Sequence, residues 1–127
     1  MAKVVAYVPD LLFGSNVAGA VQAAGHECAL VSTLDAAQVS SEAAALIVDL
    51  TAEVPARLAA ASAAIERGLP ALAFYSHVEA DVRTQALAAG FRLVVPRSRM
   101  AREGPNLVER LLTGREAAAS GPEGTAR

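Results

Sequence analysis

The sequence of 127 residues has no tryptophan, a single cysteine and a single lysine. The lone Cys28 excludes an internal disulfide and a zinc site built from cysteines, and its apolar surroundings predict a buried thiol. Aromatic residues make up only 4% of the chain, which argues against stacking platforms for single-stranded nucleic acid. A formal net charge of −2 gives no general attraction to DNA or anionic membranes. Neither is therefore expected as a partner.

Long hydrophobic runs are also missing. No apolar stretch approaches the roughly 18 residues needed to cross a membrane, and the first strand-like run meets Pro9 too early for a signal-peptide core. A soluble, cytoplasmic protein is therefore expected. With 54% hydrophobic and 19% charged residues, the chain can bury a sizeable core in one domain. We expect this domain to span residues 1–113, followed by a flexible polar tail over residues 114–127.

Apolar runs of strand length alternate with helical patterns along the chain. The predicted strands cover residues 4–8, 27–31, 45–50, 69–75 and 91–95. The predicted helices cover residues 13–24, 53–67 and 78–89, with a last helical region interrupted at Gly104-Pro105 and at most two helical turns over residues 34–43. Because the strands are almost continuously apolar, both faces of the sheet should be covered. We therefore expect an α/β fold, a three-layer doubly wound five-stranded parallel sheet with the flavodoxin-like strand order 2-1-3-4-5.

Polar side chains follow several of the predicted strands. In an open parallel sheet, ligands bind beyond the carboxyl ends of the strands. With this strand order, Asp10, Asp49, Ser76 and His77 would lie along one edge, with Arg97 beside them. Plainer explanations remain open: aspartate and serine are preferred helix caps, and either aspartate could form a structural ion pair with Arg97. The convergence of these five groups nevertheless predicts a functional edge.

With these residues at its strand ends, the chain resembles the receiver domain of two-component response regulators over residues 3–113. The resemblance implies that Asp49, in LIVDLT, stands at the position of the phospho-acceptor. Ser76, in AFYSH, matches the switch hydroxyl, and Asp10, in YVPDLL, matches one member of the acidic pair that holds Mg²⁺. The resemblance also implies that the predicted fourth helix, fifth strand and fifth helix form a surface through which two copies could dimerise.

The sequence departs from the receiver pattern at two positions. Pro9 stands where the second acidic residue is expected, and Pro96, followed by Arg97, stands where receivers have a lysine. The single lysine, Lys3, precedes the first strand at the opposite end of the sheet. Losing one carboxylate weakens Mg²⁺ binding, and a planar guanidinium does not replace the point charge of lysine. We therefore expect a pseudo-receiver with a degenerate phospho-acceptor site, in which Asp10 and Asp49 bind Mg²⁺ only weakly and no cofactor is required.

The functional hypothesis is a stand-alone signalling module that acts by contact with a protein partner, either a kinase or an effector. An alternative is a small-molecule or anion-binding domain that uses Ser76, His77 and Arg97, although the segment 13–16 lacks the glycine spacing of nucleotide-binding loops. Enzymatic activity with His77 as general base is the least favoured hypothesis, because His26 lies at the other end of the sheet. Arginines in the last third of the chain alternate with glutamates, which predicts a solvated, ion-paired helix face and not a nucleic-acid site.

Overall fold

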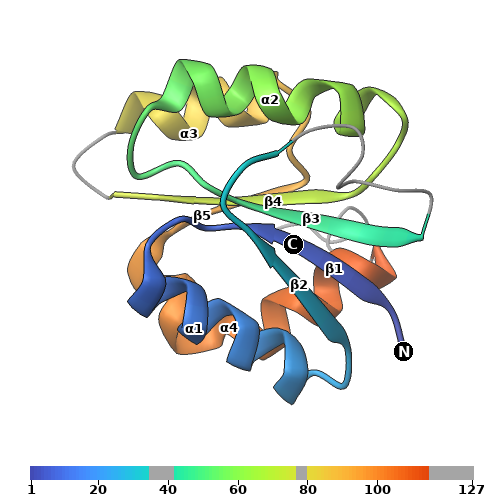
Figure 1. The fold of residues 1–127 in the computed structure, drawn as a ribbon. Helices are drawn as coiled ribbons and strands as arrows, with labels where there is room; N and C mark the ends of the chain where they lie inside the picture. Colours follow the sequence, from blue (N-terminus) through green and yellow to red (C-terminus); the bar gives the residue numbers. More distant parts are fainter. Residues whose placement is uncertain (35–41, 77–79, 115–127) are drawn as a thin grey trace, which may run out of the picture.

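The predicted alternation of strands and helices is present in the structure, a computed structural model that describes residues 1–34, 42–76 and 80–114 (Figure 1). The strands are β1 (Lys3–Tyr7), β2 (Glu27–Val31), β3 (Ala43–Asp49), β4 (Ala71–Tyr75) and β5 (Leu93–Pro96). The helices within these ranges are α1 (Leu11–Ala23), α2 (Val54–Glu66), α3 (Ala80–Ala88) and α4 (Arg97–Thr113). The helical turns expected over residues 34–43 fall mostly outside the described residues, and so does the expected tail from residue 115 onward.

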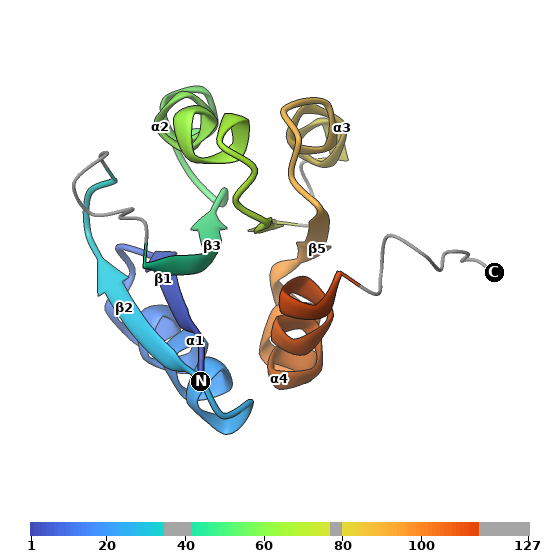
Figure 2. The same ribbon diagram turned by 90° about the vertical axis from the view of Figure 1, so that its right-hand side faces the viewer.

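All five strands are parallel and lie in the order β2-β1-β3-β4-β5, as predicted. Helices α1 and α4 cover one face of the sheet, and α2 and α3 cover the other (Figures 1 and 2). The three-layer, doubly wound architecture is therefore confirmed. The C-terminal ends of the strands lie along one edge of the sheet. At this edge, Asp49 at the end of β3 lies opposite Phe74 of β4.

Two hydrophobic cores flank the sheet, because successive side chains of a strand point to opposite faces. The core beneath α1 and α4 includes Val4, Ile47, Leu72, Phe74, Met100 and Leu107. The core beneath α2 and α3 includes Val5, Leu46, Val48, Ala73, Ala61 and Val82. Each inner strand thus supplies both cores, which explains why its sequence is almost continuously apolar. Cys28 lies on the edge strand β2 and is only half-buried, and this burial raises the pKa of its thiol.

Helix α4 consists of two helical segments that meet at a kink, at the interruption predicted from the sequence. Glu103 has non-helical backbone angles (φ −119°, ψ 20°), directly before Gly104-Pro105. A proline inside a helix removes one backbone donor and crowds the preceding turn, which accounts for the kink. At the same place α4 approaches α1 closely, since a Cβ atom on Gly104 would lie 2.6 Å from the Cβ of Ala20. No helix within the described ranges is long and apolar enough to cross a lipid bilayer.

Candidate functional site

Asp10 begins α1 as its N-cap residue. Its Oδ1 atom accepts a hydrogen bond from the backbone N–H of Phe13 at 2.9 Å, while its side chain stays exposed. This contact satisfies one of the backbone donors that a helix leaves free at its first turn. The helix-capping role considered for Asp10 from the sequence is thus realised.

Asp49, at the position of the phospho-acceptor, is only 4% exposed. Its Oδ1 atom accepts hydrogen bonds from the backbone N–H of Thr51 (2.8 Å) and from the hydroxyl of the same residue. Its Oδ2 atom lies 3.6 Å from Nη1 of Arg57. Both carboxylate oxygens therefore already face groups of the protein itself.

Arg57, in α2, is the functional candidate that the sequence analysis missed. Its Nη1 atom donates a hydrogen bond to the backbone oxygen of Asp49 at 3.0 Å, and its guanidinium carbon lies 5.5 Å from the centre of the Tyr7 ring. Nη2 lies 3.9 Å from Oε2 of Glu53, whereas the buried Nε has no hydrogen-bond partner within the described residues. A buried cation is normally paired, and here the main partner is Asp49.

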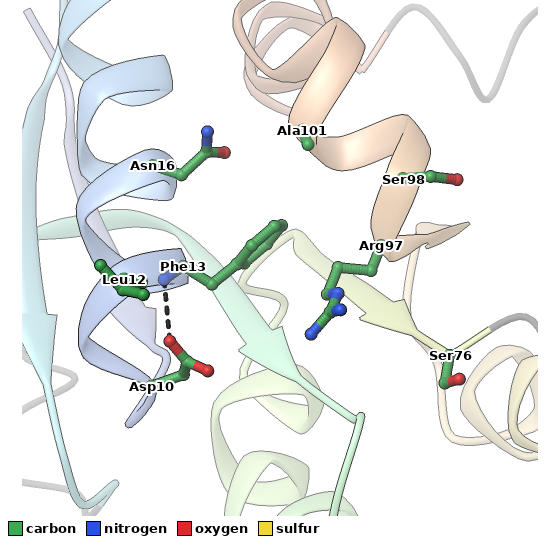
Figure 3. A pocket seen from close by; sticks show the side chains of 8 residues that line it. All are labelled: Asp10, Leu12, Phe13, Asn16, Ser76, Arg97, Ser98 and Ala101. Carbon is green, nitrogen blue, oxygen red and sulfur yellow. Dashed lines mark hydrogen bonds between the residues drawn. The ribbon is translucent and has the colours of Figure 1, made fainter.

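A pocket of about 720 Å³ lies between the beginning of α1 and the beginning of α4 (Figure 3). It is lined by Asp10, Leu12, Phe13, Asn16, Ser76, Arg97, Ser98 and Ala101. The Arg97 guanidinium reaches from α4 toward α1 and lies 5.5 Å from the centre of the Phe13 ring, a cation–π contact. The Phe13 ring packs in turn on Phe74, with the ring centres 4.8 Å apart and the planes tilted by 49°.

The structure thus distributes the predicted edge residues over two places. Asp10, Ser76 and Arg97 come together around the pocket, while Asp49 does not line it and pairs with Arg57. Among the described residues, Arg97 forms no ion pair with Asp10 or Asp49. His77 lies outside the residues that the structure describes.

The donor set does not suit the Mg²⁺ ion that the receiver resemblance implies. Mg²⁺ needs oxygen ligands in near-octahedral geometry, with one or two free carboxylates. Oδ1 of Asp49 accepts two hydrogen bonds and Oδ2 faces a guanidinium, and Oδ1 of Asp10 caps a helix. In the described part of the chain, no three acidic, histidine or cysteine side chains are grouped to hold a metal.

No protein-family model matches the sequence, and no curated protein matches it. Solved structures do match along most of the chain. A response regulator of Thermotoga maritima superimposes with a TM-score of 0.73 at 11% identity, covering 89% of this chain and 98% of that chain. A response regulator receiver protein of Burkholderia phymatum gives a TM-score of 0.74 at 19% identity, with 89% and 96% covered.

The chain has the receiver fold. A protein of Burkholderia pseudomallei described as pilus assembly-related shares this fold, with a TM-score of 0.73, 21% identity, and coverage of 89% of this chain and 90% of that one. The receiver resemblance inferred from the strand-end residues is thus confirmed at the level of the fold. At these identities the likeness concerns the arrangement of the backbone, so the use of Asp49 has to be argued from its own contacts.

Proposed function

We propose that this chain is a receiver-like signalling module that acts by contact with another protein and carries a degenerate phospho-acceptor site at Asp49. The observation that carries the proposal is the buried contact between Asp49 and Arg57, at 3.6 Å between Oδ2 and Nη1. A cation that belongs to the chain itself neutralises the carboxylate without a metal ion. The receiver fold supports the signalling part of the proposal.

The chemistry of phosphoryl transfer explains why this arrangement disfavours modification of Asp49. Transfer depends on a positioned nucleophile and on cations that neutralise the charge spread over the phosphoryl oxygens. Both carboxylate oxygens of Asp49 are held by Thr51 and Arg57, so attack would first require these contacts to break. Arg97, which follows the position of the receiver lysine, lies against Phe13. The expected rate of phosphorylation is therefore low.

The partner proposed for this module is a protein, either a kinase or an effector, in the cytoplasm. A second copy of the chain could dock on the surface formed by α3, β5 and α4, which corresponds to the surface that receivers use to dimerise. Leu87 of α3 belongs to this surface and is 41% exposed. Apolar groups that stay exposed in a monomer favour association when they become buried in an interface.

The test is treatment of the purified protein with a small-molecule phosphodonor and Mg²⁺, followed by mass spectrometry of the intact chain. The expected result is no stoichiometric gain of a phosphoryl group. The Asp49→Asn variant is the matched control, because it keeps the shape of the side chain but cannot form the acyl phosphate. A full gain in the wild-type protein that disappears in this variant would overturn the degenerate assignment and make the chain an ordinary phosphorylated receiver.

A further inference from the structure

The pocket between α1 and α4 is lined by residues other than Asp49 and Arg57. One part of its wall is apolar and consists of Leu12, Phe13 and Ala101. The other part carries polar groups, which are those of Asp10, Asn16, Ser76, Arg97 and Ser98. A volume of about 720 Å³ with both apolar and polar lining residues lies in the range of small-molecule sites.

The positive charge of Arg97 is available within this pocket. The two other arginines near the start of α4 are engaged by Glu103, with Arg99 at 3.2 Å and Arg102 at 3.0 Å. The hydrogen bond from Arg99, followed by that from Arg102, holds the pKa of the Glu103 carboxyl below its usual range, so this carboxylate stays charged and paired. Arg97 has no carboxylate partner among the described residues and contacts the ring of Phe13.

Two hydroxyl groups also line the pocket, apart from the Arg97 guanidinium, which points toward α1. Ser98 follows Arg97 in the first turn of α4, and Ser76 follows β4 (Figure 3). Neither hydroxyl has a hydrogen-bond partner in the part of the chain that the structure describes. Each hydroxyl can donate a hydrogen bond to a polar atom of a ligand, whereas the guanidinium can form the stronger, charge-assisted hydrogen bonds to an acidic group.

The apolar wall offers contact area for the rest of a ligand. Leu12 is 87% exposed although it lies at the pocket, and the Phe13 ring is fixed in place by its packing on Phe74. A flat or apolar group placed between them would remove the exposed leucine from water, which is favourable in proportion to the area covered. A rigid aromatic ring provides this contact at a low cost in conformational entropy.

We propose that this pocket binds a small organic anion, in which a phosphate or carboxylate group meets the Arg97 guanidinium while an apolar group lies against Phe13 and Leu12. Binding at this site needs neither Mg²⁺ nor modification of Asp49, so it is independent of the signalling function proposed above. Asp10 lines the same pocket with an exposed carboxylate. Its charge disfavours a second acidic group on the ligand.

Isothermal titration in the presence of EDTA tests the proposal, with phenyl phosphate as the probe. We expect phenyl phosphate to bind more tightly than inorganic phosphate or phenol, because each of these reaches only one part of the wall. The Arg97→Ala variant should bind it at least about tenfold more weakly, as expected for loss of a charge-assisted hydrogen bond. Arg97→Lys should fall between the two. Arg83→Ala, on the exposed surface of α3, removes one positive charge far from the pocket and should bind like the wild type.

The Asp10→Asn variant tests the position of the anion. Asparagine caps a helix as well as aspartate does, so α1 is preserved while one negative charge leaves the pocket. Phenyl phosphate should then bind more tightly than to the wild type. The proposal is overturned if phenyl phosphate does not bind up to its solubility limit, or if inorganic phosphate binds equally well. Equal affinity in Arg97→Ala, or weaker binding in Asp10→Asn, would also overturn it. None of these results bears on the phosphorylation of Asp49.

Discussion

Arg57 places a guanidinium against the buried Asp49 carboxylate, and a variant at this single residue tests the contact. Arg57→Met keeps an apolar stem over Tyr7 but leaves Asp49 as a buried charge without its cation. Removing one partner of a buried pair in this way should lower the free energy of unfolding by about 3 kcal/mol. Urea unfolding followed by circular dichroism measures this loss. Arg83→Met, on the exposed face of α3, should change the same quantity by less than about 0.5 kcal/mol.

The double variant Asp49→Asn/Arg57→Met separates pairing from simple loss of packing. If the two side chains are coupled, the double variant should lose at least about 1 kcal/mol less than the sum of the single losses. Strictly additive losses would show that Arg57 stabilises α2 without neutralising Asp49.

At the residue scale, the sequence predicted the polar residues at the strand ends but missed Arg57, which reaches Asp49 from α2. Asp10, Ser76 and Arg97 were found because the carboxyl ends of parallel strands share one edge. Arg57 was missed because only strand ends were considered. A signal was present: Arg57 is the single charged residue between Glu53 and Glu66. A lone charge in an otherwise uncharged helix is a reason to look for a buried partner.

At the scale of the elements, the close contact between α1 and α4 requires a glycine at position 104, which has no side chain. Gly104→Ala would place a Cβ atom 2.6 Å from the Cβ of Ala20, so the two helices would have to separate. The expected loss is about 1–3 kcal/mol of unfolding free energy, as for other overpacked contacts. Gly19→Ala, in α1, meets nothing within 4 Å and should instead stabilise the protein by up to about 1 kcal/mol. Thermal and urea unfolding of the two variants would contradict this account if both changed stability in the same direction.

Every described element was predicted in type, and two of the boundary errors, both at strand starts, have a clear physical cause. The fourth and fifth strands were expected from residues 69 and 91, but β4 begins at Ala71 and β5 at Leu93. The apolar residues before them belong to helix ends, since Leu69 N–H bonds to the Ala64 oxygen and Phe91 N–H to the Ala86 oxygen. Each follows a glycine with positive φ, Gly68 or Gly90. This hydrogen-bonded stop packs an apolar residue against the core just after the helix, and hydrophobicity alone cannot distinguish it from the start of a strand.

At the scale of the whole molecule, the topology followed from physical rules that hold for any chain of this pattern. Alternating apolar strands and helices, right-handed crossovers and two covered faces leave few arrangements, and the observed order β2-β1-β3-β4-β5 is one of them. The chemistry of the edge does not follow from these rules, because the same fold supports sites of different kinds. In this chain Asp49 faces Arg57, one turn into α2, and only the residue type at that position supplies this cation.

The pairing of Asp49 with Arg57 predicts how the stability of the folded protein responds to Mg²⁺. An ion that binds the native state and not the unfolded chain raises the unfolding temperature, and the rise continues as the free ion concentration exceeds the dissociation constant. Because Arg57 already neutralises Asp49 and the described residues offer no three-ligand group, Mg²⁺ should leave the unfolding temperature unchanged relative to EDTA at matched ionic strength. Differential scanning calorimetry over a series of Mg²⁺ concentrations makes the measurement. A temperature that rises with the Mg²⁺ concentration in the wild type, and stays constant in Asp49→Asn, would show that the ion competes with Arg57 for the carboxylate.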